Sequence, residues 1–264
     1  MRRATIRVSM GCLAWVLAGW SAWAQAPIPD AATEPTIPKR PEPIPSGNEP
    51  NSPFVSIAAG FYHTCALTQG GALLCWGKDG RDWVRDGHRY ITDCRRVPTL
   101  VDGLTSGVAM VSSGAMHTCA VNSMGRAMCW GANRHGQLGA GISSWQEGFQ
   151  REVSGLTGVV QISAGQFHTC AVTSRGAALC WGLNRFGALG TGTTQMQRLP
   201  TPVAGLTSGV VAISAGSFHT CAVTTSGGVL CWGYNRSGAL GDGTTIRRLV
   251  PTQVSGLATG VVAI

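Results

Sequence analysis

The stretch "FHTCAVTSRGAALCWGLNRFGALGTGTT", residues 167 to 194, decides the fold because the chain repeats it. Its first part returns as "YHTCALTQGGALLCWG" from Tyr62, "MHTCAVNSMGRAMCWG" from Met116 and "FHTCAVTTSGGVLCWG" from Phe218. The first cysteines of the four copies are 54, 51 and 51 residues apart. A regular period near this length with strand-like content is typical of propeller blades. We therefore expect an all-β protein, a β-propeller of about four repeat units.

Each copy predicts a β-hairpin. The strands "HTCAVT" and "AALCWG" flank a three-residue turn formed by Ser174, Arg175 and Gly176, with Thr173 and Ala177 closing the hairpin. The third turn position asks for a left-handed residue, which glycine adopts without strain. Glycine occupies it in every copy, as Gly71, Gly125, Gly176 and Gly227.

The cysteines of each hairpin face one another in this register. Cys170 and Cys180 form a non-hydrogen-bonded pair, whose Cα atoms lie about 4.5 Å apart, within the range of a disulfide. The same spacing pairs Cys65 with Cys75, Cys119 with Cys129, Cys170 with Cys180, and Cys221 with Cys231. A zinc site that includes His168 and reduced structural cysteines are the alternatives. Thiols pair in oxidising compartments, so we expect disulfides and neither a metal nor another cofactor.

The N-terminal segment predicts export. Residues 1–26 have a basic start, an apolar run from Val8 to Trp20 and small residues at Ala22, Ala24 and Ala26, the layout of a cleaved signal peptide. An uncleaved anchor is the alternative, but the run is short for a span of about 20 residues. Residues 27–53 hold nine of the 13 prolines and predict a stiff linker. We expect a secreted, periplasmic or cell-surface protein with no membrane span after cleavage.

Composition supports a turn-rich protein without nucleic-acid partners. Glycine supplies 37 of 264 residues and charged residues only 12%, against about 7% and about 25% in ordinary proteins. The net charge of +8 includes Arg2, Arg3 and Arg7 of the signal peptide, so 17 basic residues would remain against 12 acidic ones. That excess is too small to indicate nucleic-acid binding.

Histidine and tryptophan recur with the hairpin, as His63, His117, His168 and His219 and as Trp76, Trp130, Trp181 and Trp232. We expect packing and hydrogen bonding at equivalent blade positions, because a large aromatic residue fixed beside a hairpin usually belongs to the core. A carbohydrate platform is the alternative for the tryptophans.

The histidine, the glycine turn, "WG.N..G.LG" and "GT" together resemble the repeat of the regulator of chromosome condensation family, with exported disulfide-bearing bacterial members as the nearest type. The resemblance covers units of about 54–107, 108–158, 159–209 and 210–260, then the start of a fifth. It implies a seven-bladed propeller, so four units predict a partial arc or a fragment. Two chains could instead close a larger ring, or four blades could close on themselves.

The first unit departs from the repeat. The segment "KDGRDWVRDGHRYITDC", residues 78–94, replaces the "N..G.LG" turn and brings Arg81, Trp83, Arg85 and Tyr90 together with the unpaired Cys94. Arginine and aromatic residues in one loop are typical of binding sites. A drifted terminal blade is the alternative reading. Cys94 could be a free thiol or an intermolecular link.

We expect an exported, non-catalytic scaffold that presents blade loops to a protein partner. Arg134, Arg185 and Arg236 recur after an asparagine and could line one rim, or could be solvated turn residues copied with the repeat. The second class is a cell-wall or polysaccharide binder using Trp83 and Trp145. The resemblance also implies two further roles, nucleotide exchange and secreted enzyme inhibition, since the family includes a nuclear exchange factor and a β-lactamase inhibitor. Export conflicts with the nuclear role, and no hydrolase elbow or phosphate loop indicates an enzyme.

Overall fold

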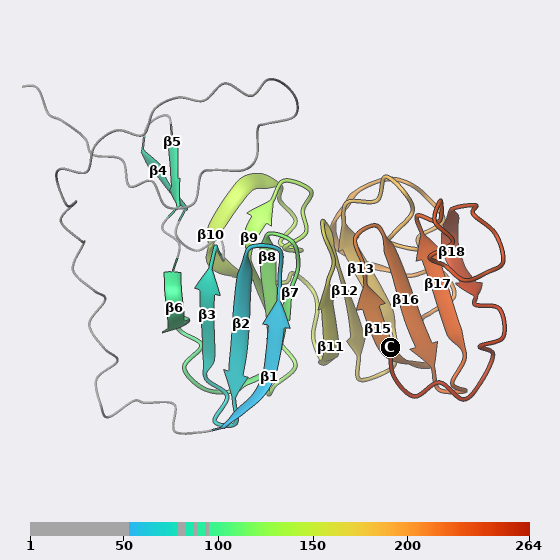
Figure 1. Ribbon diagram of the computed structural model, residues 1–264, viewed down its shortest axis with the longest axis horizontal. Coiled ribbons are helices and arrows are strands. Elements are labelled where there is room, and N and C mark those ends of the chain that lie inside the picture. The colour runs from blue at the N-terminus through green and yellow to red at the C-terminus, as the bar shows by residue number, and fades with distance from the viewer. Residues whose placement is uncertain (1–52, 79–82, 87–88, 93–94) are drawn as a thin grey trace, which may run out of the picture. The chain divides into compact units, whose positions relative to one another are not determined.

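A computed structural model describes residues 53–78, 83–86, 89–92 and 95–264. These residues form four antiparallel four-stranded sheets, each a propeller blade, and one two-stranded hairpin (Figure 1). The signal peptide predicted over residues 1–26 and the linker up to residue 52 lie outside the described residues, as does Cys94. In the described ranges, no helix is long and apolar enough to cross a membrane.

The strands of blades 2, 3 and 4 follow one another directly along the chain, whereas blade 1 has an insertion after its third strand. Blade 1 contains β1 (Phe54–Ala59), β2 (His63–Thr68), β3 (Leu73–Gly77) and β6 (Arg95–Leu100). Blade 2 contains β7 (Val108–Ser113), β8 (His117–Asn122), β9 (Ala127–Asn133) and β10 (Ser144–Glu152). Blade 3 contains β11 (Val159–Ala164), β12 (His168–Thr173), β13 (Ala178–Gly182) and β14 (Gln197–Pro202). Blade 4 contains β15 (Val210–Ala215), β16 (His219–Thr224), β17 (Val229–Gly233) and β18 (Arg248–Gln253).

The first strand of each blade is the innermost. Strand β7 contacts both β1 and β11, and β11 contacts β15, so these strands run beside one another along a common axis. The sheets succeed one another from blade 1 to blade 4 without closing into a ring (Figure 1). The structure therefore confirms the all-β propeller of four units.

The hairpin between the second and third strands has the predicted turn. In blade 3 the Thr173 amide donates to the Ala177 carbonyl at 2.9 Å, and the Gly176 amide donates to the Thr173 carbonyl at 2.8 Å. Gly176 has a φ of +73°, and a Cβ there would lie 2.7 Å from the Gly209 amide nitrogen. Glycine is thus required both by the left-handed turn and by the close approach of the next segment.

The four predicted disulfides are present. Each joins directly opposed residues of one hairpin at a Cα separation of 4.1 Å: Cys65–Cys75, Cys119–Cys129, Cys170–Cys180 and Cys221–Cys231. Every cysteine in the described ranges takes part in one of them. The disulfide interpretation of the repeated cysteines is confirmed.

The core fills the seams between blades. At each of the three seams, one cluster combines the buried disulfide of one blade with a tryptophan of the next. Trp130, Trp181 and Trp232 are the tryptophans of these clusters, and each is fully buried. These three side chains belong to the core as expected, and the carbohydrate-platform alternative is wrong for them.

Candidate functional site

Two kinds of connection meet at one end of the blades. The Ala-Gly turns of blades 1, 3 and 4 and the Ser-Gly turn of blade 2 join the first strand to the second. The Asn-Arg loops leave the third strand in blades 2, 3 and 4. Because neighbouring strands are antiparallel, both lie at the end opposite the hairpin turns. We call this surface the loop face, formed by residues 59–62, 113–116, 164–167 and 215–218 with 134–139, 185–190 and 236–241.

A buried asparagine fixes the shape of each Asn-Arg loop. In blade 3 the Asn184 side chain accepts a hydrogen bond from the Leu189 amide at 3.0 Å. Its amide group donates to the carbonyls of Thr193 and Gln195, both at 3.0 Å. Asn133 and Asn235 hold their loops through equivalent bonds to Leu138 and Leu240. The asparagine of the repeat is therefore structural, and it holds the following arginine at a fixed position.

The predicted arginines Arg134, Arg185 and Arg236 occupy this position in three consecutive blades, and all three are exposed. The Arg185 guanidinium lies 5.6 Å from the centroid of the Phe186 ring, within the range of a cation–π contact. The structure thus places all three candidates on the loop face. Their contribution to binding remains a prediction.

The described candidates of the first unit lie in two short strands that follow β3. Trp83 and Arg85 belong to β4 (Trp83–Asp86) and Tyr90 to β5 (Arg89–Thr92), which pair as an antiparallel hairpin with Arg85 opposite Tyr90. Strand β4 contacts β10 of blade 2. Arg81 lies outside the described residues. The departure from the repeat thus contains an inserted hairpin, which the sequence pattern does not indicate.

A row of aromatic side chains on the loop face was not predicted from the sequence. Its members are His135, Phe167, Phe218, Phe186 and Tyr234, and all are half-buried. Successive ring centroids in this order are 5.4, 6.1, 5.3 and 5.1 Å apart. The residue before each "HTC" is Tyr62, Met116, Phe167 or Phe218, and this recurrence of large side chains could have revealed part of the row. We call these five residues the aromatic row.

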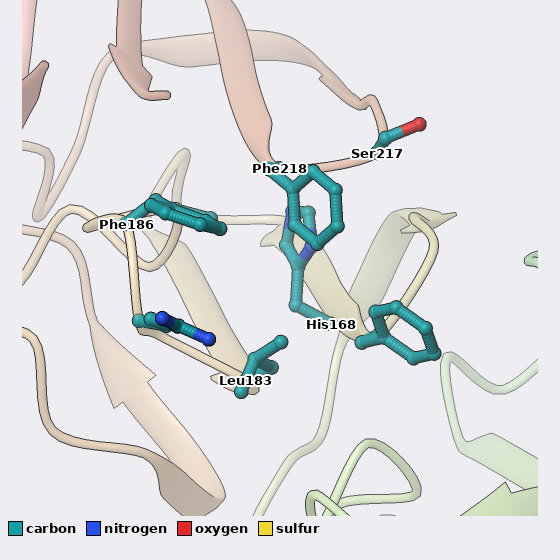
Figure 2. Close-up of a pocket in the computed structure, with 8 residues that line it drawn as sticks. His168, Leu183, Phe186, Ser217 and Phe218 are labelled. Carbon is teal, nitrogen blue, oxygen red and sulfur yellow. The ribbon is translucent and has the colours of Figure 1, made fainter. Parts of the chain in front are cut away.

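The row crosses the seam between blades 3 and 4 at a shallow depression. Phe218 of blade 4 lies beside Phe186 of blade 3 there, as Figure 2 shows. Leu183, Arg185 and Ser217 also line the depression. His168 lies behind the Phe218 ring in this view. The depression therefore joins apolar ring surface to an exposed guanidinium group, a combination suited to contact with another macromolecule.

A second depression of about 240 Å³ opens near the axis of the blades. It is lined by the turns between the first and second strands of all four blades, with Phe61 and Gln166 as its largest side chains. None of its lining residues titrates near neutral pH. The side chains that line the depression could therefore contact a ligand but could not act as a general acid or base near neutral pH.

The repeated histidines tie neighbouring blades together. The Thr169 hydroxyl of blade 3 donates to the Gln137 carbonyl of blade 2 at 2.8 Å, so it must accept from His117 Nε2, which lies 2.9 Å away. Trp181 Nε1 donates to the same carbonyl at 2.8 Å. His63 with Thr118, and His168 with Thr220, form the equivalent bonds at the other two seams. The expected hydrogen-bonding role of these histidines is confirmed.

Burial keeps these histidines neutral. Removal from water, followed by the charges of the neighbouring His63 and His168, lowers the pKa of His117 to about 3. Burial, followed by the charge of His219, lowers the pKa of His168 to about 4. No group of three metal-ligating side chains occurs in the described part of the chain. The disulfides take up the cysteines that the zinc alternative required.

The chain belongs to a family of propeller repeat domains. Residues 18–264 match the model of the RCC1-like domain. The repeated sequence, the four blades and the buried asparagine of each Asn-Arg loop are consistent with this family. The resemblance seen in the sequence is therefore confirmed at the level of the family.

Among curated proteins, the chain is similar to the Arabidopsis thaliana RCC1 domain-containing protein RUG3, mitochondrial, with 34% identity over 70% of this chain and 43% of that protein. It is 33% identical to the Rattus norvegicus probable E3 ubiquitin-protein ligase HERC4 over 64% of this chain and 16% of that protein. The chain thus spans less than half the length of these relatives.

Solved structures show the same fold. Human WBSCR16 is 27% identical, with a TM-score of 0.66 over 78% of this chain and 54% of that one. Yeast RCC1 (Prp20), solved bound to Kap60, is 22% identical, with a TM-score of 0.65 over 78% of this chain and 49% of that one.

Proposed function

We propose that the protein is an exported, non-catalytic scaffold that binds a protein partner through its loop face. The observation that carries the proposal is the composition of this face. Arg134, Arg185 and Arg236 stand exposed beside the half-buried aromatic row. Arginine and aromatic side chains are the residue types that contribute most binding energy at protein interfaces.

The positions of the titratable groups favour binding over catalysis. His117 and His168 are buried in the seams and use Nε2 to hold a threonine of the next blade. Of the carboxylates, Asp242 pairs with Arg248 and Glu152 with Arg126. A general acid or base must instead reach a substrate and titrate near the working pH. These four side chains are thus engaged in hydrogen bonds or ion pairs within the fold.

Export is supported by two independent features. Residues 1–26 have the layout of a signal peptide, and each of the four blades contains a disulfide. Disulfides form and persist mainly outside the reducing cytosol. We place the mature protein in the periplasm, at the cell surface or in the medium.

A site-specific crosslink tests the proposed function. A photoreactive phenylalanine derivative replaces Arg185 on the loop face or, as the matched control, Arg175 in a hairpin turn at the other end of blade 3. Both arginines are exposed. Irradiation with the producing organism's exported proteins should give a protein adduct at position 185 and none at 175. Replacing Arg134, Arg185 and Arg236 by alanine should then weaken the purified partner's binding by about tenfold or more.

The same preparation tests the polysaccharide alternative. The Trp83 and Trp145 candidates for that activity lie in β4 and β10. Retention on insoluble peptidoglycan that soluble glycan competes away, without a protein adduct at position 185, would contradict the protein-binding function.

A further inference from the structure

We infer that the loop face of blades 3 and 4 binds an acidic, partly apolar segment of a partner protein. The inference rests on the proposed function and adds the chemistry of the partner. The binding surface consists of Arg185, Arg236, Phe186, Phe218 and Tyr234. Two exposed guanidinium groups here accompany three ring surfaces that remain partly open to water.

The two arginines are available for an external carboxylate. Both follow a fully buried asparagine, so the backbone that bears them is fixed by hydrogen bonds to Asn184 and Asn235. The Arg185 guanidinium carbon lies 5.6 Å from the centroid of the Phe186 ring. An exposed guanidinium group can donate two parallel hydrogen bonds to a carboxylate.

The described carboxylates do not neutralise this surface. Asp242 is the described carboxylate on this side of blades 3 and 4, and its Oδ2 accepts from Arg248 Nε at 2.6 Å. Glu152 pairs with Arg126, and Asp102 lies in the turn after β6. Both of these belong to the hairpin end of the blades. The surface is thus positively charged, and a negatively charged partner would be attracted to it.

The aromatic rings add an apolar requirement. Phe186 lies 5.3 Å from Phe218 and 5.1 Å from Tyr234 between ring centroids, so the three rings form one continuous surface across the seam. A purely anionic chain such as an acidic polysaccharide would satisfy the arginines but leave this surface exposed to water. A peptide that alternates carboxylates with apolar or aromatic side chains matches both. The arrangement therefore favours an acidic protein segment.

A peptide selection tests this specificity directly. A random-peptide phage library is selected against the oxidised protein and against two double-charge variants. The first, Arg185→Glu with Arg236→Glu, alters the proposed surface. The second, Arg126→Glu with Arg175→Glu, changes exposed arginines of two hairpin turns and serves as the control. The unaltered protein and the control should enrich the same acidic peptides containing apolar residues, and the first variant should not.

Soluble peptides then give the affinities. An enriched peptide should bind the first variant about tenfold or more weakly than the control, and its binding should weaken as salt is added. Replacing its glutamates by glutamines should abolish binding. Circular dichroism of both variants verifies that they fold.

Three results would overturn the inference: enrichment of neutral or basic peptides, equal enrichment by both variants, or no enrichment. None of them affects the crosslink at position 185, so the scaffold function can survive when the acidic specificity fails. Equal binding of a fluorescent polyglucuronate, with the same loss in the first variant, would instead show that the site recognises anionic charge alone and would also overturn it.

Discussion

Thr169 shows how a single side chain can join two blades. Its hydroxyl donates to the Gln137 carbonyl and accepts from His117 Nε2, and it is fully buried. The adjacent histidine of the same repeat, His168, makes the same bond to Thr220 of the following blade. In the "HT" pair of blade 3, the threonine accepts a hydrogen bond from the histidine of the preceding blade. The histidine donates one to the threonine of the following blade. This bond explains why the histidine recurs together with the threonine.

Removing the Thr169 hydroxyl should destabilise the protein. In Thr169→Val the side chain keeps its volume, but His117 Nε2 is left buried without an acceptor, at a cost of about 1–3 kcal/mol. Urea denaturation should show a lower midpoint. The control Thr225→Val changes an exposed threonine at a hairpin turn and should lie within about 0.5 kcal/mol of the parent. Equal midpoints for the two variants would contradict the role of the hydroxyl.

At the scale of the element, the Ala-Gly turns depend on contact between neighbouring blades. Gly165 has no unusual φ, yet a Cβ there would lie 2.5 Å from the Gly216 carbonyl oxygen and 2.6 Å from His168 Cε1. Gly238 presents the opposite case, because its φ is +73° and a Cβ would meet nothing within 4 Å. A side chain at position 165 would therefore clash with a neighbouring blade, whereas one at position 238 would only force a left-handed backbone on a residue other than glycine.

We expect Gly165→Ala to be more destabilising than Gly238→Ala. The second variant suffers only left-handed strain, about 1–2 kcal/mol, whereas the first must displace backbone of blade 4 and the His168 ring. Thermal unfolding of both, with the disulfides intact, measures the difference. A smaller loss of melting temperature in Gly165→Ala than in Gly238→Ala would contradict the packing described for this turn.

The contrast between these elements also explains which features the sequence could predict. The hairpin around Gly176 and the pairing of Cys170 with Cys180 depend on residues a few positions apart, so spacing alone was sufficient. The aromatic row was missed because Phe186 and Phe218 meet only when two blades pack. The inserted hairpin at β4 and β5 was missed because it has no counterpart in the other repeats.

At the scale of the whole molecule, the same histidine bond recurs at every seam. His63, His117 and His168 link blade 1 to 2, 2 to 3 and 3 to 4. Each seam also contains a disulfide and a tryptophan. Repeat proteins are stabilised largely by such contacts between neighbours. A change that acts on all three histidines at once should therefore affect the entire arc.

Acid should be such a change. Burial lowers the pKa of His117 from 6.5 to about 3 and that of His168 to about 4. Between these values and 6.5 the unfolded chain binds protons that the folded chain does not, so stability falls as the pH decreases. Above about pH 6.5 these histidines no longer make the stability depend on pH. Each histidine should contribute a slope of about 1.4 kcal/mol per pH unit within its window.

Urea denaturation between about pH 7 and about pH 5 measures this slope. His117→Gln provides the diagnostic variant, because its amide can still donate to Thr169 but does not titrate. Its stability should be lower at neutral pH, while its pH slope should decrease by the contribution of one proton. An unchanged slope in His117→Gln, or a parent protein whose urea midpoint does not vary over this interval, would show that the seam histidines are protonated in the folded arc. The bond from His117 Nε2 to Thr169 would then be compatible with a charged ring, and acid would leave the seams intact.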